Sequence, residues 1–252
     1  MTKYVQTEEI DGILKVTINR PDKKNALLPE MYTALADAID HADADDKIRV
    51  LFFTGTGDSF TAGNDLKDFL NNPTNDEDRP VNRFLGTIAQ AQTPLVTAVN
   101  GLAIGVGVTM LLHCDLNYAS ETARFQMPFV DLAVVPEAGS SYLLPRMMGR
   151  QQAAELLMLG EMFSAAKAQA VGIINDVFES DRLQEIAWQK ALSLSQKPPE
   201  ALKLTKNLLR KGDLATTIEF MREEGKLFRE RLVSDESREV MMAFFEKRQP
   251  NF

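Results

Sequence analysis

Cysteine and histidine are scarce in this sequence. Cys114 is the one cysteine among 252 residues, so no intramolecular disulfide is possible and we expect a reducing compartment. The two histidines, His41 and His113, belong to no Cys/His cluster with metal-ligand spacing. The sequence therefore excludes a disulfide framework and predicts no metal site.

The chain also lacks an excess of basic residues and a long apolar run. Its 28 Lys and Arg residues are outnumbered by 36 Asp and Glu residues, which gives a formal net charge of −8. A nucleic-acid surface needs clustered positive charge, so we expect no nucleic-acid partner. No apolar run is long enough to span a membrane, and the segment MTKYVQTEEIDG has no apolar signal-peptide core. We therefore expect a cytoplasmic protein with no membrane partner.

The first half of the chain alternates strand-like and helix-like segments, which is typical of an α/β fold. Residues 29–43 begin with proline and carry apolar residues at helical spacing, so they are predicted to form a helix. The polar, proline-bounded residues 71–80 are predicted to form a loop. Apolar runs bounded by turn residues predict strands at 13–21, 49–57, 93–101 and 115–120.

From residue 150 onward nearly every segment has helical periodicity, apart from one short strand predicted at 174–178. Ser164 and Asp235 are predicted to be N-caps. The last helices carry more Met, Leu and Phe than a small helical tail can bury, which favours oligomerisation. We therefore divide the chain into an α/β core, residues 1–195, and a C-terminal helical oligomerisation region, residues 196–252.

Two glycine-containing turns each join a buried strand to the start of an apolar helix. They read SFTAGNDLKDF (59–69) and VNGLAIGVGVTMLLHCD (99–115). Backbone N–H groups at a helix start have no partner within the helix, and they stabilise a developing negative charge. Two such groups that converge on one oxygen form an oxyanion hole.

Other interpretations of the polar residues in these segments are weaker or purely structural. Gly105 and Gly107 resemble a dinucleotide fingerprint, but Met110 occupies the position of its third glycine. Asp65 can simply cap the helix that follows it, and His113 lies on an apolar face, which is typical of a core histidine. Ser140 and Ser141 lack a histidine base in a recognisable motif.

One acid stands out in the segment AVVPEAGSS (133–141), where Glu137 follows a proline. Proline is favoured at the first helical position and an acid suits the helix dipole. Local sequence alone therefore favours a helix that starts near Pro136, with Glu137 in its first turn and without a catalytic role.

Four segments resemble the enoyl-CoA hydratase/isomerase (crotonase) superfamily, and the resemblance extends over essentially the whole chain: FTAGNDL, PLVTAVNGLAIGVG with CDLNYAS, FSAAKAQAVGIINDVF and FFEKRQPNF. It implies a spiral of ββα repeats with a C-terminal helical region that builds a trimer, often stacked as a hexamer. It also implies an acyl-CoA substrate whose thioester oxygen lies between the backbone N–H groups of Asn64 and Val106. No cofactor is implied, because coenzyme A is part of the substrate.

The side chains of the site decide which reaction the resemblance implies. Thr109 and Phe129 stand where hydratases of the superfamily carry their two glutamates. VPEAGSS and AGNDL instead resemble the peroxisomal-type 3-enoyl-CoA/2-enoyl-CoA isomerases of fatty-acid β-oxidation, in which one glutamate is the only acid/base. The resemblance therefore implies that Glu137 moves a proton from carbon 2 to carbon 4 of the acyl chain. An apolar setting that includes Val134, Val135 and Phe129 should raise the pKa of Glu137.

The same resemblance implies which residues contact the substrate: Lys24, Ala26, Ala62, Gly63, Asn64, Asp65, Leu66 and Phe129. Three alternatives remain open. The protein could be a hydratase in which another carboxylate, such as Asp131, holds the water. It could isomerise an aromatic-catabolic CoA ester, in which Glu137 would also serve. It could bind CoA esters without catalysis.

Overall fold

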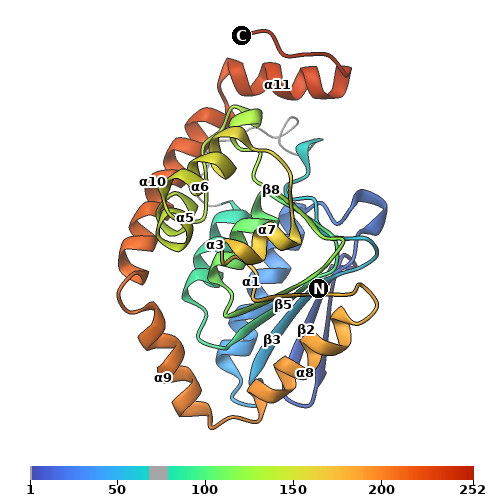
Figure 1. Ribbon diagram of the computed structural model, residues 1–252, viewed down its shortest axis with the longest axis vertical. Helices are drawn as coiled ribbons and strands as arrows, with labels where there is room; N and C mark the ends of the chain where they lie inside the picture. Colours follow the sequence, from blue (N-terminus) through green and yellow to red (C-terminus); the bar gives the residue numbers. More distant parts are fainter. Residues whose placement is uncertain (1, 68–78) are drawn as a thin grey trace.

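A computed structural model of the chain describes residues 2–67 and 79–252 (Figure 1). Its larger sheet has six strands in the order β1-β2-β3-β5-β7-β10. The strands are parallel except for the antiparallel pair of β1 and β2. Their bounds are β1 Val5–Ile10, β2 Ile13–Ile18, β3 Val50–Gly55, β5 Leu95–Val99, β7 Leu116–Ser120 and β10 Asp176–Phe178.

A smaller sheet lies beyond the ends of these strands, with the order β4-β6-β8-β9. Its strands are β4 Ser59–Thr61, β6 Leu102–Ile104, β8 Arg124–Gln126 and β9 Phe163–Ser164. The strands β4, β6 and β8 each follow one strand of the larger sheet after a short turn and are parallel to one another. The chain therefore repeats a strand–turn–strand unit, as the predicted ββα spiral requires.

Helices cover both faces of the larger sheet. α1 and α3 pack against each other and contribute residues to the main core, whereas α8 covers the opposite face (Figure 1). There Trp188 of α8 lies edge-on to Phe52 of β3, with 5.4 Å between the ring centroids. The helices are α1 Pro29–Ala44, α3 Pro80–Gln90, α4 Val106–Thr109, α5 Ser140–Met148, α6 Arg150–Ala154, α7 Ala165–Ala170, α8 Leu183–Ser195, α9 Pro199–Arg210, α10 Leu214–Leu232 and α11 Asp235–Glu246.

The sequence-based elements are confirmed in type, with shorter strands. The predicted N-cap Ser164 accepts a hydrogen bond from the Lys167 amide. Asp235 is not an N-cap: Ser234 takes that role and accepts from the Ser237 amide. The sequence did not predict β1, which is mostly polar. It also did not predict four strands that have only two or three residues each: β4, β6, β8 and β9. Residues 71–78 of the predicted loop lie outside the described residues, and Pro80 begins α3.

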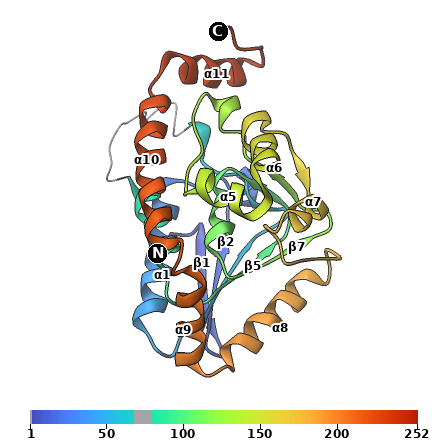
Figure 2. The same cartoon turned by 60° about the vertical axis from the view of Figure 1, so that its left-hand side comes forward.

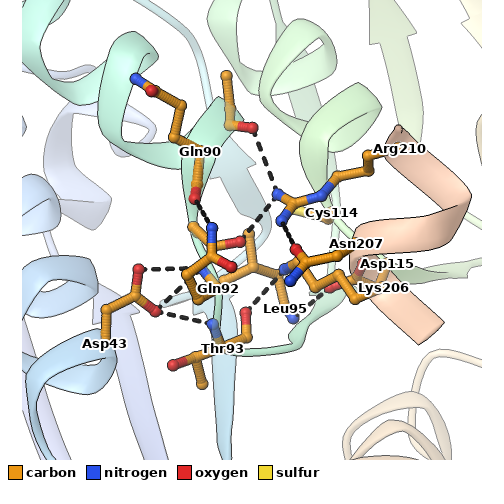
Figure 3. A network of polar contacts seen from close by, with 12 residues as sticks. Asp43, Gln90, Gln92, Thr93, Leu95, Cys114, Asp115, Lys206, Asn207 and Arg210 are labelled. Carbon is orange, nitrogen blue, oxygen red and sulfur yellow. Dashed lines mark hydrogen bonds and ion pairs between the residues drawn. The ribbon is translucent and has the colours of Figure 1, made fainter. Parts of the chain in front are cut away.

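The helix α9 is attached to the α/β core by a buried polar network (Figure 3). Lys206 Nζ donates to the Thr93 carbonyl at 2.8 Å and to Asp115 at 2.7 Å, and Arg210 donates to the Ala91 carbonyl at 2.8 Å. Burial lowers the pKa of Lys206, whereas Asp115 opposes that shift. The first helix of the C-terminal region therefore packs on the core of its own chain, and the division at residue 195 stays a prediction.

The remaining C-terminal helices differ in how they are placed. α10 lies beside α5 and also contacts α3, whereas α11 lies at one end of the molecule (Figures 1 and 2). In residues 2–67 and 79–252 no helix has both the length and the apolar character needed to cross a membrane.

Replacing Lys206 with alanine should lower the free energy of unfolding by about 3 kcal/mol, because the change leaves Asp115 and the Thr93 carbonyl without their shared partner. Urea unfolding of the wild type and Lys206→Ala checks this. The exposed Lys203 on the same helix is the matched control, and Lys203→Ala should leave stability unchanged. Equal stability of both variants would contradict an anchoring role.

Candidate active site

The two glycine turns lie against each other. Within each segment a short strand precedes the glycine turn: Gly63 follows β4 and Gly105 follows β6, and these are neighbouring parallel strands of the smaller sheet. The longer strands β3 and β5, which the sequence predicted before these segments, lie one turn earlier in the chain. Parallel pairing places the carboxyl ends of both strands at one edge. Gly63 has a φ of +80°, and a Cβ built on it would lie 2.7 Å from the Ile104 carbonyl oxygen. Only glycine allows this close approach of the two turns.

Two backbone amides at these turns can donate hydrogen bonds to a substrate oxygen. Val106 is the first residue of α4, and Asn64 follows Gly63. Within residues 2–67 and 79–252 neither amide donates a hydrogen bond. The side chain of Asn64 is fixed, since its Oδ1 accepts from the Tyr32 hydroxyl at 2.5 Å. Tyr32 lies on the buried face of α1, where the sequence pattern indicates only a core residue.

Glu137 lies ahead of a helix and not within its first turn. Ala138 and Gly139 adopt φ values of +60° and +72°, which are incompatible with an α-helix, so α5 begins at Ser140. The prediction of a helix start near Pro136 is therefore wrong. The side chain of Glu137 is only 6% exposed.

The surroundings of Glu137 favour its protonated form. Burial, followed by the negative charge of Glu224, raises the pKa of Glu137 to about 7, and a hydrogen bond from Thr109 opposes this. The Thr109 hydroxyl lies 3.4 Å from Glu137 Oε1. A carboxyl with this pKa can both accept and donate a proton near neutral pH. Val134 and Phe129 are buried in the main core, but Phe129 does not line the cavity beside Glu137.

A cavity of about 240 Å³ joins Glu137 to the first turn. Glu137, Ala138 and Asn64 line it, and residues of α3 and α10, both apolar and polar, make up most of the remaining lining. The other lining residues are Arg79, Val81, Asn82, Leu85, Gly86, Gln90, Ile218, Met221, Arg222, Gly225, Phe228, Arg229 and Leu232. α10, which the sequence assigned to oligomerisation, is therefore part of the candidate site. Asp131 is exposed and does not line this cavity.

The predicted substrate-binding residues other than Phe129 are brought together by contacts between loop 20–27 and the first turn. Arg20 donates to the Ala26 carbonyl at 3.0 Å and pairs with Asp65 at 2.8 Å. The Ala62 amide donates to the Lys24 carbonyl at 2.9 Å, and the Leu27 amide donates to the Gly63 carbonyl at 2.8 Å. Of the eight residues, Asn64 alone lines the cavity.

Two side chains in these contacts also have local roles. Asp65 accepts from the Lys67 amide at 3.0 Å, so the local capping interpretation holds alongside its pairing with Arg20. The ammonium group of Lys24 pairs with Asp58 at 2.5 Å on the surface.

In the described parts of the chain, no group of three or more His, Cys, Asp or Glu side chains is arranged to hold a metal ion.

His113 supports the turn that follows Glu137. Its Nε2 lies 2.8 Å from the Ala138 carbonyl oxygen. A carbonyl can only accept, so Nε2 carries the proton. Burial lowers the pKa of His113 to about 4, so the imidazole is neutral at pH 7. His113 is half-buried and its ring is hydrogen-bonded, which agrees with a structural role but not with full burial in the core, and local sequence did not predict this contact.

Comparison with known proteins identifies the family. The sequence profile of the enoyl-CoA hydratase/isomerase family matches residues 8–252. The chain belongs to this family. It is 36% identical to enoyl-CoA delta isomerase 2 of Rattus norvegicus over 92% of the chain, but it spans only 61% of that relative's length. It is 34% identical to 1,2-epoxyphenylacetyl-CoA isomerase of Escherichia coli, with 100% of the chain and 99% of the relative covered.

Solved structures confirm the crotonase-like fold. A crystal structure of an enoyl-CoA hydratase/isomerase from Pseudoalteromonas atlantica superimposes with a TM-score of 0.95 at 44% identity, and 99% of this chain and 100% of that chain are covered. Relatives named as isomerases and relatives named as hydratases both occur. The comparisons therefore establish the hydratase/isomerase family and leave open which of its reactions applies.

Replacing Glu137 with glutamine should stabilise the protein at alkaline pH. The folded-state pKa of Glu137, about 7, lies above the ordinary value of 4.5, so the free energy of unfolding of the wild type falls as the pH rises between these values. The glutamine variant lacks this loss and should be more stable by about 3 kcal/mol at pH 8, with no advantage at pH 4.5. Urea unfolding at several pH values measures the difference. A pH-independent difference would contradict the raised pKa.

Proposed function

We propose that the protein converts 3-enoyl-CoA to 2-enoyl-CoA, with Glu137 as the single acid/base. The main support is that Glu137, buried and with a pKa raised to about 7, shares a cavity with Asn64, whose backbone amide donates no hydrogen bond within the described residues. The proposed pathway context is fatty-acid β-oxidation, with coenzyme A as part of the substrate and no further cofactor.

The proposed reaction has two proton transfers through one intermediate. The Glu137 carboxylate removes a proton from carbon 2, and the C–H bonding electrons pass into a dienolate whose charge rests on the thioester oxygen. The amides of Asn64 and Val106 donate to that oxygen, and each such donor contributes roughly 3 kcal/mol. Protonated Glu137 then delivers the proton to carbon 4, and the double bond moves to carbons 2 and 3.

The same geometry gives little support for hydration. Adding water requires groups that hold and deprotonate the water molecule. Thr109 contacts Glu137 with a hydroxyl, and Phe129 lies in the core. Asp131, the acid left open by the sequence, is exposed and away from the cavity lining.

Isomerisation of an aromatic CoA ester is the second candidate. The similarity to 1,2-epoxyphenylacetyl-CoA isomerase covers 100% of this chain, and a single carboxylate beside an oxyanion hole also suits that chemistry. Relative kcat/KM values for straight-chain and aromatic CoA esters separate the two candidates.

Wild-type enzyme should convert trans-3-hexenoyl-CoA to its 2-enoyl isomer, and Glu137→Gln should reduce kcat by about two orders of magnitude or more with KM little changed. The reason is that the amide cannot relay a proton. Direct absorbance of the 2-enoyl thioester, without a coupling enzyme, follows the reaction.

Glu230→Gln is the matched control for that experiment, because Glu230 is an exposed glutamate on α10 outside the cavity lining. Crotonyl-CoA and water supply the competing hydration assay. Faster hydration than isomerisation by the wild type would overturn the proposal, and full activity of Glu137→Gln would favour the interpretation that Glu137 is structural. An inert wild type that still binds acyl-CoA would favour a binding protein.

We also propose that the chain forms a trimer or a hexamer through its exposed apolar helices. Leu204 and Leu208 of α9 and Phe244 and Phe245 of α11 are exposed in the single chain. Analytical ultracentrifugation should show a trimer or hexamer, and the double change Leu204→Glu with Leu208→Glu should lower the mass if α9 is part of the interface. A wild-type monomer at micromolar concentration would contradict the proposal.

A further inference from the structure

Glu224 of α10 is a second buried glutamate, and it contacts the turn that directly follows Glu137. Its side chain is 6% exposed and does not line the cavity of Glu137. Its carboxylate accepts from the Gly139 amide at 2.6 Å, from the Ser141 amide at 2.9 Å and from the Ser141 hydroxyl at 2.5 Å. These donors lie at the N-terminal end of α5, where backbone N–H groups lack partners within the helix.

The turn that receives these contacts is an unfavourable one. Ala138 is a non-glycine residue with a positive φ, +60°, and such conformations need support from surrounding structure. α10 packs closely on the next residue, because a Cβ built on Gly139 would lie 2.8 Å from the Thr217 methyl group. His113 donates a hydrogen bond to the Ala138 carbonyl. The residue immediately before this turn is Glu137.

We propose that Glu224 is a positioning residue for the isomerisation: its carboxylate holds the turn Ala138–Ser141 and thereby keeps Glu137 directed into the cavity. This inference rests on the proposed function of Glu137. It assigns to α10 a direct part in arranging the acid/base, in addition to lining the cavity. Since Glu224 is not itself a lining residue of the cavity, we place its action on Glu137 and not on the substrate.

Several charged or titratable groups face Glu137, and the charge of Glu224 has a predictable effect among them. Glu224 of α10 raises the pKa of Glu137, and Tyr32 of α1 interacts electrostatically with the same carboxyl. Three arginines line the shared cavity: Arg79, Arg222 and Arg229. Removing the Glu224 charge while leaving the arginines in place should therefore move the titration of Glu137 to lower pH.

Glu224→Gln tests the proposal. Glutamine offers one accepting oxygen and one NH₂ group, so it places a donor against the donors of Gly139 or Ser141. We expect kcat for trans-3-hexenoyl-CoA to fall about tenfold or more with KM within about threefold, because small displacements of an acid/base are costly. The acidic limb of the pH profile of kcat/KM should move to lower pH. Glu219→Gln, an exposed glutamate on the same helix, should change neither quantity.

Unchanged kcat and pH profile in a folded Glu224→Gln protein would overturn the proposal, as would a reduced kcat with an unmoved acidic limb, which indicates general destabilisation. If Glu224→Gln does not fold, Ser141→Ala replaces it: this variant keeps the charge and removes one donor. Ser141→Ala should lower kcat severalfold without moving the acidic limb of the kcat/KM profile to lower pH. A Ser141→Ala protein with the kcat of the wild type would then overturn the proposal.

A stability measurement separates this inference from the proposed function. The gain in melting temperature that Glu137→Gln produces at pH 8 should shrink in the Glu224→Gln background, because the two carboxylates no longer repel each other. If the wild type is inert toward every 3-enoyl-CoA, the proposed function fails, yet this cycle still reports whether the two residues are coupled. Additive effects in the cycle would overturn the positioning role whatever the activity.

Discussion

The parallel pairing of β4 with β6 is the constraint on which the rest of the site depends. Each strand has three residues, and each leads directly into a glycine turn. Because Gly63 has no side chain, the first turn can lie against the Ile104 carbonyl of the second. That contact brings the amide of Asn64 next to the start of α4, and α4 ends at Thr109, which touches Glu137. One close contact between two backbone segments therefore connects the proposed oxyanion-binding amides with the proposed acid/base, Glu137.

The site holds two buried carboxylates, and their burial carries a free-energy cost. A buried charge is unfavourable unless it receives hydrogen bonds or a partner. Glu224 has three donors, two of them backbone amides, whereas the Glu137 side chain accepts one long hydrogen bond, from Thr109, among the residues that the structure describes. This difference separates the roles: the carboxylate with three hydrogen-bond donors is suited to support, and the one with a single long hydrogen bond is suited to proton transfer. The unfavourable burial of Glu137 thus raises its pKa and makes its carboxylate a stronger base.

The C-terminal helices are tied to the core in two different ways. α9 is attached through Lys206, which donates to the Thr93 carbonyl and to Asp115, and Asp115 in turn accepts from the Leu95 amide at the start of β5 (Figure 3). α10 is attached through Glu224 and lines the cavity. α10 lies between α9 and α11 in the sequence. If chains associate through the exposed apolar residues of α9 and α11, that association would therefore also restrain the position of α10.

The sequence by itself determined the α/β class, the longer helices and strands, and the family, because these depend on local periodicity and on motifs within about ten residues. It also singled out Glu137, Asn64 and Val106, through the residues around them. Only the tertiary structure decided that the helix after Pro136 starts at Ser140, since the left-handed turn there is held by His113 and Glu224. The partners Gly139 and Glu224 are 85 residues apart, and no local pattern encodes a contact at that separation. For the same reason the strands of the smaller sheet, too short to show a period, and the role of Tyr32 became visible only in the folded chain.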